Sequence, residues 1–170
     1  MHLSGLRIPL NANSLYVCTL PLTGSAFHWS LIHVDHDGIH TRHHWAAVTR
    51  DIQGREAYVE NVLPYGALPS TGNNKILGYF KISDYTPIDV AALRDVCRRI
   101  FPISYSTVAE NRSYSITCRT WISQVLSKLI SEGRAQEIEE HVKKLSTVQS
   151  NEYANSFLWG RHFMCIVENV

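Results

Sequence analysis

Cys118 stands at a position in the sequence where a cysteine could act as a nucleophile. The stretch from Ser115 to Gly133 predicts a helix, because Thr117 has the side chain of an N-cap residue and Gly133 suits the left-handed position past a C-terminus. Apolar residues recur three and four positions apart on one face with Cys118: Ile122, Val125, Leu126, Leu129 and Ile130. A thiol in the first turn lies near free backbone N–H groups and the positive helix end, which favour the thiolate. A buried structural cysteine is the alternative interpretation.

His28 is the upstream residue that could serve this thiol as a base. Residues 27–34, F-H-W-S-L-I-H-V, predict a strand, and residues 39–45 predict the strand that returns after a turn at Asp37-Gly38. Alternation places His28, Ser30, Ile32 and Val34 on one face of this hairpin.

The length of the turn decides which histidine of the returning strand joins His28. A two- or four-residue loop places His43 beside it, whereas a three-residue loop with a bulge places His40 and His44 there. The dipeptide Asp-Gly is preferred at the two central positions of a two-residue hairpin turn. We therefore expect His43 to orient His28.

A cysteine at a helix N-terminus and a histidine on a strand are the groups that thiol acyl transfer requires. The imidazole takes the thiol proton and returns it to the leaving group, and a third polar group fixes the imidazole tautomer. The backbone N–H of Cys118 is a natural first oxyanion donor, and Asn111 or Tyr114 could supply the second.

The order and placement of these motifs resemble a known superfamily. His28 begins H-W-S-L-I, an Asp-Gly turn and a histidine-bearing strand follow, and Cys118 later opens a helix as C-R-T-W. This arrangement is similar to the circularly permuted papain-like cysteine enzymes, which include the NlpC-type domains and the lecithin:retinol acyltransferase relatives. It is also loosely similar to an uncharacterised family of small fungal proteins. The resemblance implies a papain-like core, Cys118 as nucleophile, His28 as base and a third polar residue on the next strand.

The remaining pattern predicts one α+β domain spanning residues 1–170. Further strands are expected at residues 14–20, 57–62 and 74–83 and at a closing R-H-F-M-C-I-V segment. Two more helices are expected, one from Thr86-Pro87 to Ile100 and one over residues 135–145, with residues 103–114 as a polar connection. Hairpin connections and this element order favour a mainly antiparallel sheet packed with two to three helices.

Composition excludes several classes of function. With 16 basic and 15 acidic residues, the net charge of +1 offers no basic face for a nucleic acid and no polybasic membrane anchor. No apolar run is long enough to span a membrane, and no secretory leader is recognised. Four widely spaced cysteines without a C-x-x-C pair indicate reduced thiols, so we expect a cytoplasmic protein.

The sequence thus predicts a cysteine hydrolase or acyltransferase that acts on an amide, ester or thioester of a small molecule, without a cofactor. One alternative is a non-catalytic pocket protein, since eight tyrosines and four tryptophans could line an apolar cavity. A less favoured alternative is a metal site built from the nine histidines. No metal-binding spacing appears, and the adjacent His43 and His44 point to opposite faces of a strand, so neither metal nor cofactor ligands are predicted.

Overall fold

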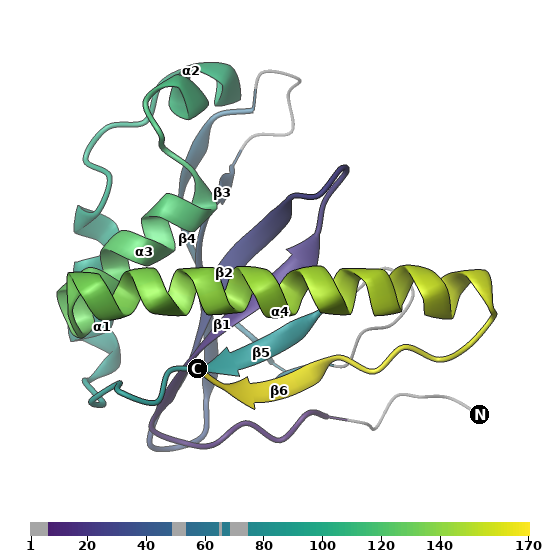
Figure 1. Cartoon of the computed structure of the whole chain (residues 1–170). Helices are drawn as coiled ribbons and strands as arrows, with labels where there is room; N and C mark the ends of the chain where they lie inside the picture. The colour runs from purple at the N-terminus through teal and green to yellow at the C-terminus, as the bar shows by residue number, and fades with distance from the viewer. Residues whose placement is uncertain (1–6, 49–53, 65, 69–74) are drawn as a thin grey trace.

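A six-stranded sheet forms the centre of the structure, which is a computed structural model that describes residues 7–48, 54–64, 66–68 and 75–170 (Figure 1). The strands are β1 (Ser14–Pro21), β2 (Phe27–Val34), β3 (His40–Ala47), β4 (Glu56–Val62), β5 (Gly78–Lys81) and β6 (Ile166–Asn169). Their order is β4-β3-β2-β1-β5-β6, and every neighbouring pair is antiparallel except β5 and β6. The expected α+β class is therefore confirmed.

Four helices complete the described part of the chain: α1 (Val90–Arg99), α2 (Val108–Ser113), α3 (Cys118–Leu129) and α4 (Glu132–Leu158). The expected start of α3 at Cys118 is confirmed. Its expected end is wrong, because the Ser131 side chain accepts a hydrogen bond from the Arg134 N–H and starts α4, so Gly133 lies inside that helix.

Three other expected boundaries also change. α1 begins at Val90 with Asp89 as its N-cap, rather than with Thr86 as the cap, since the Asp89 carboxylate accepts a hydrogen bond from the Ala92 N–H. The supposed connection over residues 103–114 contains α2, which Thr107 and Glu110 cap reciprocally. α4 is 27 residues long rather than 11, and it packs against α3 and against β1 and β5 on the helical face of the sheet (Figure 1). Among the later strands, Asn74 lies outside the described residues, and β6 begins after Cys165.

The sheet has an apolar layer on each face. The helices cover one face, where Trp29 and Leu31 of β2 join Trp121 and Ile122 of α3 in the larger core cluster. The opposite face buries a smaller cluster of strand residues and loop residues: Tyr16, Cys18, Ile32, Val34, Ala67, Ile76 and Tyr79. Alternation along β2 therefore assigns odd-numbered residues to the helical face and even-numbered residues to the other.

The turn between β2 and β3 differs from the expected one. Asp35 and Ile39 close the hairpin through an Asp35 N–H bond to the Ile39 carbonyl, and Gly38 adopts φ 77°, so three residues form the loop. The Asp35 carboxylate also accepts bonds from the Asp37 and Ile39 N–H groups, which stabilises this longer turn. Asp-Gly is thus placed at the end of a three-residue loop, and the register shifts by one.

Candidate active site

Cys118 is held at the first position of α3 by a complete capping box. The Thr117 hydroxyl accepts a bond from the Thr120 N–H, and the Thr120 hydroxyl accepts one from the Thr117 N–H, both at 3.0 Å. The carbonyl of Ile116, one residue earlier, accepts a bond from Arg112 at 2.5 Å. The capping box and the hydrogen bond from Arg112 together fix the backbone that carries the thiol.

The thiol lies beside the end of β2 that does not pair with β3. These strands pair only from Leu31↔His43 to Val34↔His40. Beyond that, β3 continues against β4, while β2 continues against β1. The first residues of α3 stand where the two strand pairs diverge (Figure 1). Cys118 Sγ is 3.9 Å from the Phe27 carbonyl oxygen, on the unpaired edge of β2.

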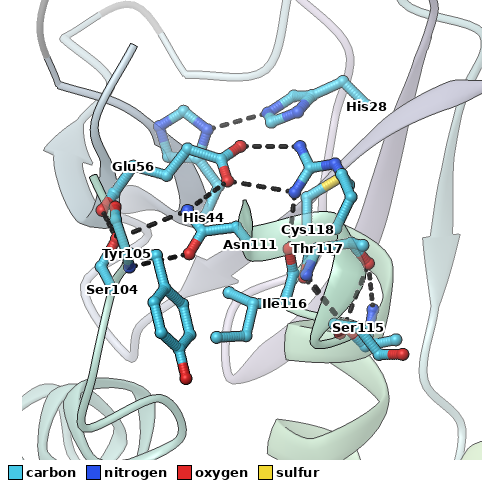
Figure 2. A network of polar contacts seen from close by, with 12 residues as sticks. His28, His44, Glu56, Ser104, Tyr105, Asn111, Ser115, Ile116, Thr117 and Cys118 are labelled. Carbon is cyan, nitrogen blue, oxygen red and sulfur yellow. Dashed lines mark hydrogen bonds and ion pairs between the residues drawn. The ribbon is translucent and has the colours of Figure 1, made fainter. Parts of the chain in front are cut away.

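His28 follows Phe27 directly but projects from the face of β2 that points away from the helices. There its Nε2 lies 2.9 Å from His44 Nδ1, and the two rings meet edge-on (Figure 2). When His28 Nε2–H donates this bond, His28 Nδ1 carries a lone pair and can accept a proton. His44 therefore has the geometry of an orienting partner.

The expectation that His43 joins His28 is wrong, because the three-residue turn places His43 on the helical face. His43 is fully buried, and its Nδ1 lies 2.7 Å from the Tyr58 hydroxyl. Tyr58 in turn donates to Glu60, which is paired with Arg94. His43 is thus part of a separate polar chain beneath α3.

Burial sets the protonation of the His28–His44 pair. It lowers the pKa of His28, and the nearby Arg42 guanidinium lowers it further. Burial likewise lowers the pKa of His44 to about 4, with additional repulsion from His28. Both rings are therefore neutral near pH 7, as a general base must be.

Burial also raises the pKa of the Cys118 thiol. The Trp29 N–H, the Arg112 charge and the Arg119 N–H oppose this shift without reversing it. The N–H groups at the helix end act in the expected direction, but burial of the thiol outweighs them, so the thiolate is not the favoured form. Cys118 and His28 rest as a neutral thiol and a neutral imidazole.

A buried ion pair supports the site, and sequence reasoning missed it. Glu56 is 5% exposed and accepts two bonds from the Arg112 guanidinium, at 2.7 and 3.0 Å, and one from the Asn111 amide at 3.0 Å (Figure 2). Both charges contribute to the pKa of His28 and of Cys118, in opposite directions. Nothing local in the sequence signals this contact, because 56 positions separate its partners.

Neither Asn111 nor Tyr114, the two expected second oxyanion donors, is available to donate a hydrogen bond beside the thiol. The amide nitrogen of Asn111 donates to Glu56, and its oxygen accepts from the Tyr105 N–H. Tyr114 is 63% exposed and stacks on Tyr105. Asn111 is therefore a structural residue that ties α2 to β4.

A small pocket of about 240 Å³ opens beside the thiol. Apolar atoms come from Leu22, Phe27 and Trp29, and Cys118 lies in the wall. The remaining lining side chains are Ser25, Ala26, Arg112, Thr117, Arg119 and Lys143. Pockets for drug-sized ligands are larger, so this one suits a small group.

Two of the other cysteines lie in the core of the described structure. Cys18 and Cys97 are fully buried, and burial raises the pKa of each thiol to about 12. Within the described residues, no three His, Cys, Asp or Glu side chains are grouped to hold a metal ion. No helix in the same part of the chain is long and apolar enough to cross a membrane.

Comparisons with protein-family models, with curated proteins and with solved structures find no match to this chain. The resemblance to the permuted papain-like enzymes therefore continues to depend on the motifs themselves.

Proposed function

We propose that the protein is a cysteine hydrolase or acyltransferase in which Cys118 is the nucleophile and His28 the general base. The observation that carries the proposal is the position of the Cys118 sulfur, 3.9 Å from the carbonyl of the residue that precedes His28. At that position β2 and β3 have separated. No β3 residue pairs with β2 before Leu31, so the edge of β2 that carries Phe27 and His28 is left unpaired beside the first turn of α3.

The neutral resting pair favours general-base activation. As Cys118 Sγ attacks the acyl carbon, the thiol proton passes to His28 Nδ1 and a C–S bond forms. The tetrahedral intermediate then collapses, the bond from the acyl carbon to the leaving group breaks, and the imidazolium returns the proton to that group. His44 accepts the hydrogen bond from His28 Nε2–H throughout and holds the tautomer.

The second half of the reaction repeats these proton transfers. Water, or another nucleophile, gives a proton to His28 and attacks the thioester, and the released Cys118 sulfur takes the proton back. The backbone N–H of Cys118, in the first turn of α3, supports the oxyanion in both halves. Hydrolysis and transfer differ only in the second nucleophile.

Pocket size supports a small acyl substrate. A pocket of about 240 Å³ has room for a short acyl group and offers no extended cleft for a polypeptide. A permuted papain-like core would place the nucleophile and base in the observed chain order, with the histidine strand before the cysteine helix.

One observation favours a second candidate function, a non-catalytic binding pocket. Burial raises the Cys118 pKa, as it does for an inert core thiol. In this alternative the same pocket binds a small molecule without acylation of Cys118, and His28 does not act as a base.

Acylation by p-nitrophenyl acetate separates the two functions. Intact-mass spectrometry should detect one acetyl group on the native protein and none on Cys118→Ala. Replacement of His28 by Ala should slow acylation by about a hundredfold or more, as expected for a lost general base. The matched control His36→Ala removes an exposed histidine and should acylate at the native rate. Equal acylation of native protein and Cys118→Ala would favour the binding pocket.

A further inference from the structure

The pocket beside Cys118 has an unbalanced electrostatic lining. Three of its side chains are cationic, Arg112, Arg119 and Lys143, and no Asp or Glu lines it. The positive end of α3 faces the same space through Thr117 and Cys118. The whole chain carries a net charge of only +1, so this concentration of positive charge is local.

The three cations differ in how far they are neutralised. Arg112 is fully engaged by the buried Glu56. Arg119 is paired with Glu139 at 3.2 Å and keeps a side chain that is 45% exposed. Lys143 has no carboxylate within ion-pairing distance among the described residues. The pocket therefore keeps about one uncompensated positive charge, and Arg119 can still donate to a ligand.

From this lining we infer that the pocket selects acyl substrates bearing an anionic group, a carboxylate or a phosphate. Lys143 and Arg119 bind that group, while the apolar wall formed by Phe27 and Trp29 contacts the carbon chain. Part of this inference rests on the proposed function, since the substrate's acyl carbon must reach Cys118. The electrostatic preference of the pocket itself does not depend on catalysis.

Two alkylating reagents of nearly equal size test the charge preference at the thiol itself. Iodoacetate and iodoacetamide both transfer a two-carbon group to sulfur with loss of iodide, but only iodoacetate is an anion. We expect the rate ratio of iodoacetate to iodoacetamide at Cys118 to exceed that of a free thiol. Lys143→Gln and Arg119→Gln should each lower the ratio by about two- to threefold at low ionic strength, as one unit charge at several ångströms in water implies. Lys144→Gln is the matched control, since Lys144 is the next residue of α4 and does not line the pocket.

The outcomes separate the inference from the proposed function. An unchanged ratio in both Lys143→Gln and Arg119→Gln, or a native Cys118 that neither reagent alkylates, would overturn the anionic-substrate inference. A charge-dependent ratio in a protein that p-nitrophenyl acetate never acetylates would support the anionic pocket and contradict catalysis. Protection of Cys118 from iodoacetamide by inorganic phosphate, but not by acetate, would assign a phosphate substrate, and the reverse would assign a carboxylate.

Discussion

Replacement of Glu56 by Gln is the most informative structural perturbation, because this carboxylate joins β4 to the segment that carries Cys118. Glu56 is 5% exposed and receives bonds from Arg112 at 2.7 and 3.0 Å and from Asn111 at 3.0 Å. Glutamine keeps the shape but loses the charge, and its NH₂ group faces a donor instead of accepting from it. Arg112 then has no partner of opposite charge in this network.

The size of the effect follows from burial. Removing one member of a buried ion pair costs about 3–5 kcal/mol, whereas an exposed pair contributes less than about 1 kcal/mol. Because the Arg112 side chain is 42% exposed, water recovers part of the loss, and we expect a decrease of about 2 kcal/mol in the free energy of unfolding. For a chain of this length, that decrease corresponds to a Tm lower by about 4–8 °C.

Urea denaturation and calorimetry measure this loss, with Asp95→Asn as the matched control. Asp95 forms an exposed i,i+4 pair with Arg99, whose side chain is 81% exposed, so Asp95→Asn should change the free energy by less than about 0.5 kcal/mol. An equal, small effect of Glu56→Gln and Asp95→Asn would refute the reasoning, because it would mean that the Glu56 network does not stabilise the fold.

Three further predictions concern the thiol and its surroundings. Thr117→Ala removes the cap hydroxyl of α3 and should lower the free energy of unfolding by about 1 kcal/mol in urea titrations, whereas no loss would contradict the capping assignment. Because burial raises the Cys118 pKa, the rate of its alkylation by iodoacetamide should still increase with pH where the rate for a free cysteine has levelled off, and a plateau at lower pH would refute this. The folded state also holds the thiol proton more tightly than the unfolded chain does, so the contribution of the thiol to stability is present at low pH and is lost as the pH rises through the raised pKa. His44→Ala should slow acylation of Cys118 more than His43→Ala does, since only His44 contacts His28, whereas His43→Ala should chiefly lower stability; a normal rate in His44→Ala would remove His44 from the site.

Local patterns in the sequence predict an element correctly where the contacts that form it lie between neighbouring residues. The Thr117 cap and the apolar stripe predict the start of α3, and period-two alternation predicts β2. The Asp37-Gly38 turn shows the limit of such patterns. The Asp35 carboxylate accepts two backbone bonds across the loop, and this competing contact selects three residues instead of two.

The polar support of the site depends on contacts between distant segments, so local patterns could not reveal it. Glu56 meets Arg112 only because β4 lies beside β3 and α2 folds back against β4. The Cys118 pKa was misjudged for a related reason, since the helix end is visible in sequence but the burial of the thiol is not. The helix expected over residues 135–145 is real, but its length was underestimated. The apolar line used to define it ends at Leu145, whereas α4 continues to Leu158 and contacts β1, where the Ser146 hydroxyl bonds to Thr19.

Chemical rescue of His28→Ala tests most directly whether Cys118 and His28 act as one unit. The measured quantity is the rate of Cys118 acetylation by p-nitrophenyl acetate, followed by intact mass, with increasing concentrations of imidazole. We expect His28→Ala to be slowed by about a hundredfold or more, and imidazole to restore part of the rate by supplying the missing base. Cys118→Ala should remain unacetylated at every imidazole concentration. A His28→Ala protein that acetylates at the native rate without imidazole would contradict the assignment of His28 as the base.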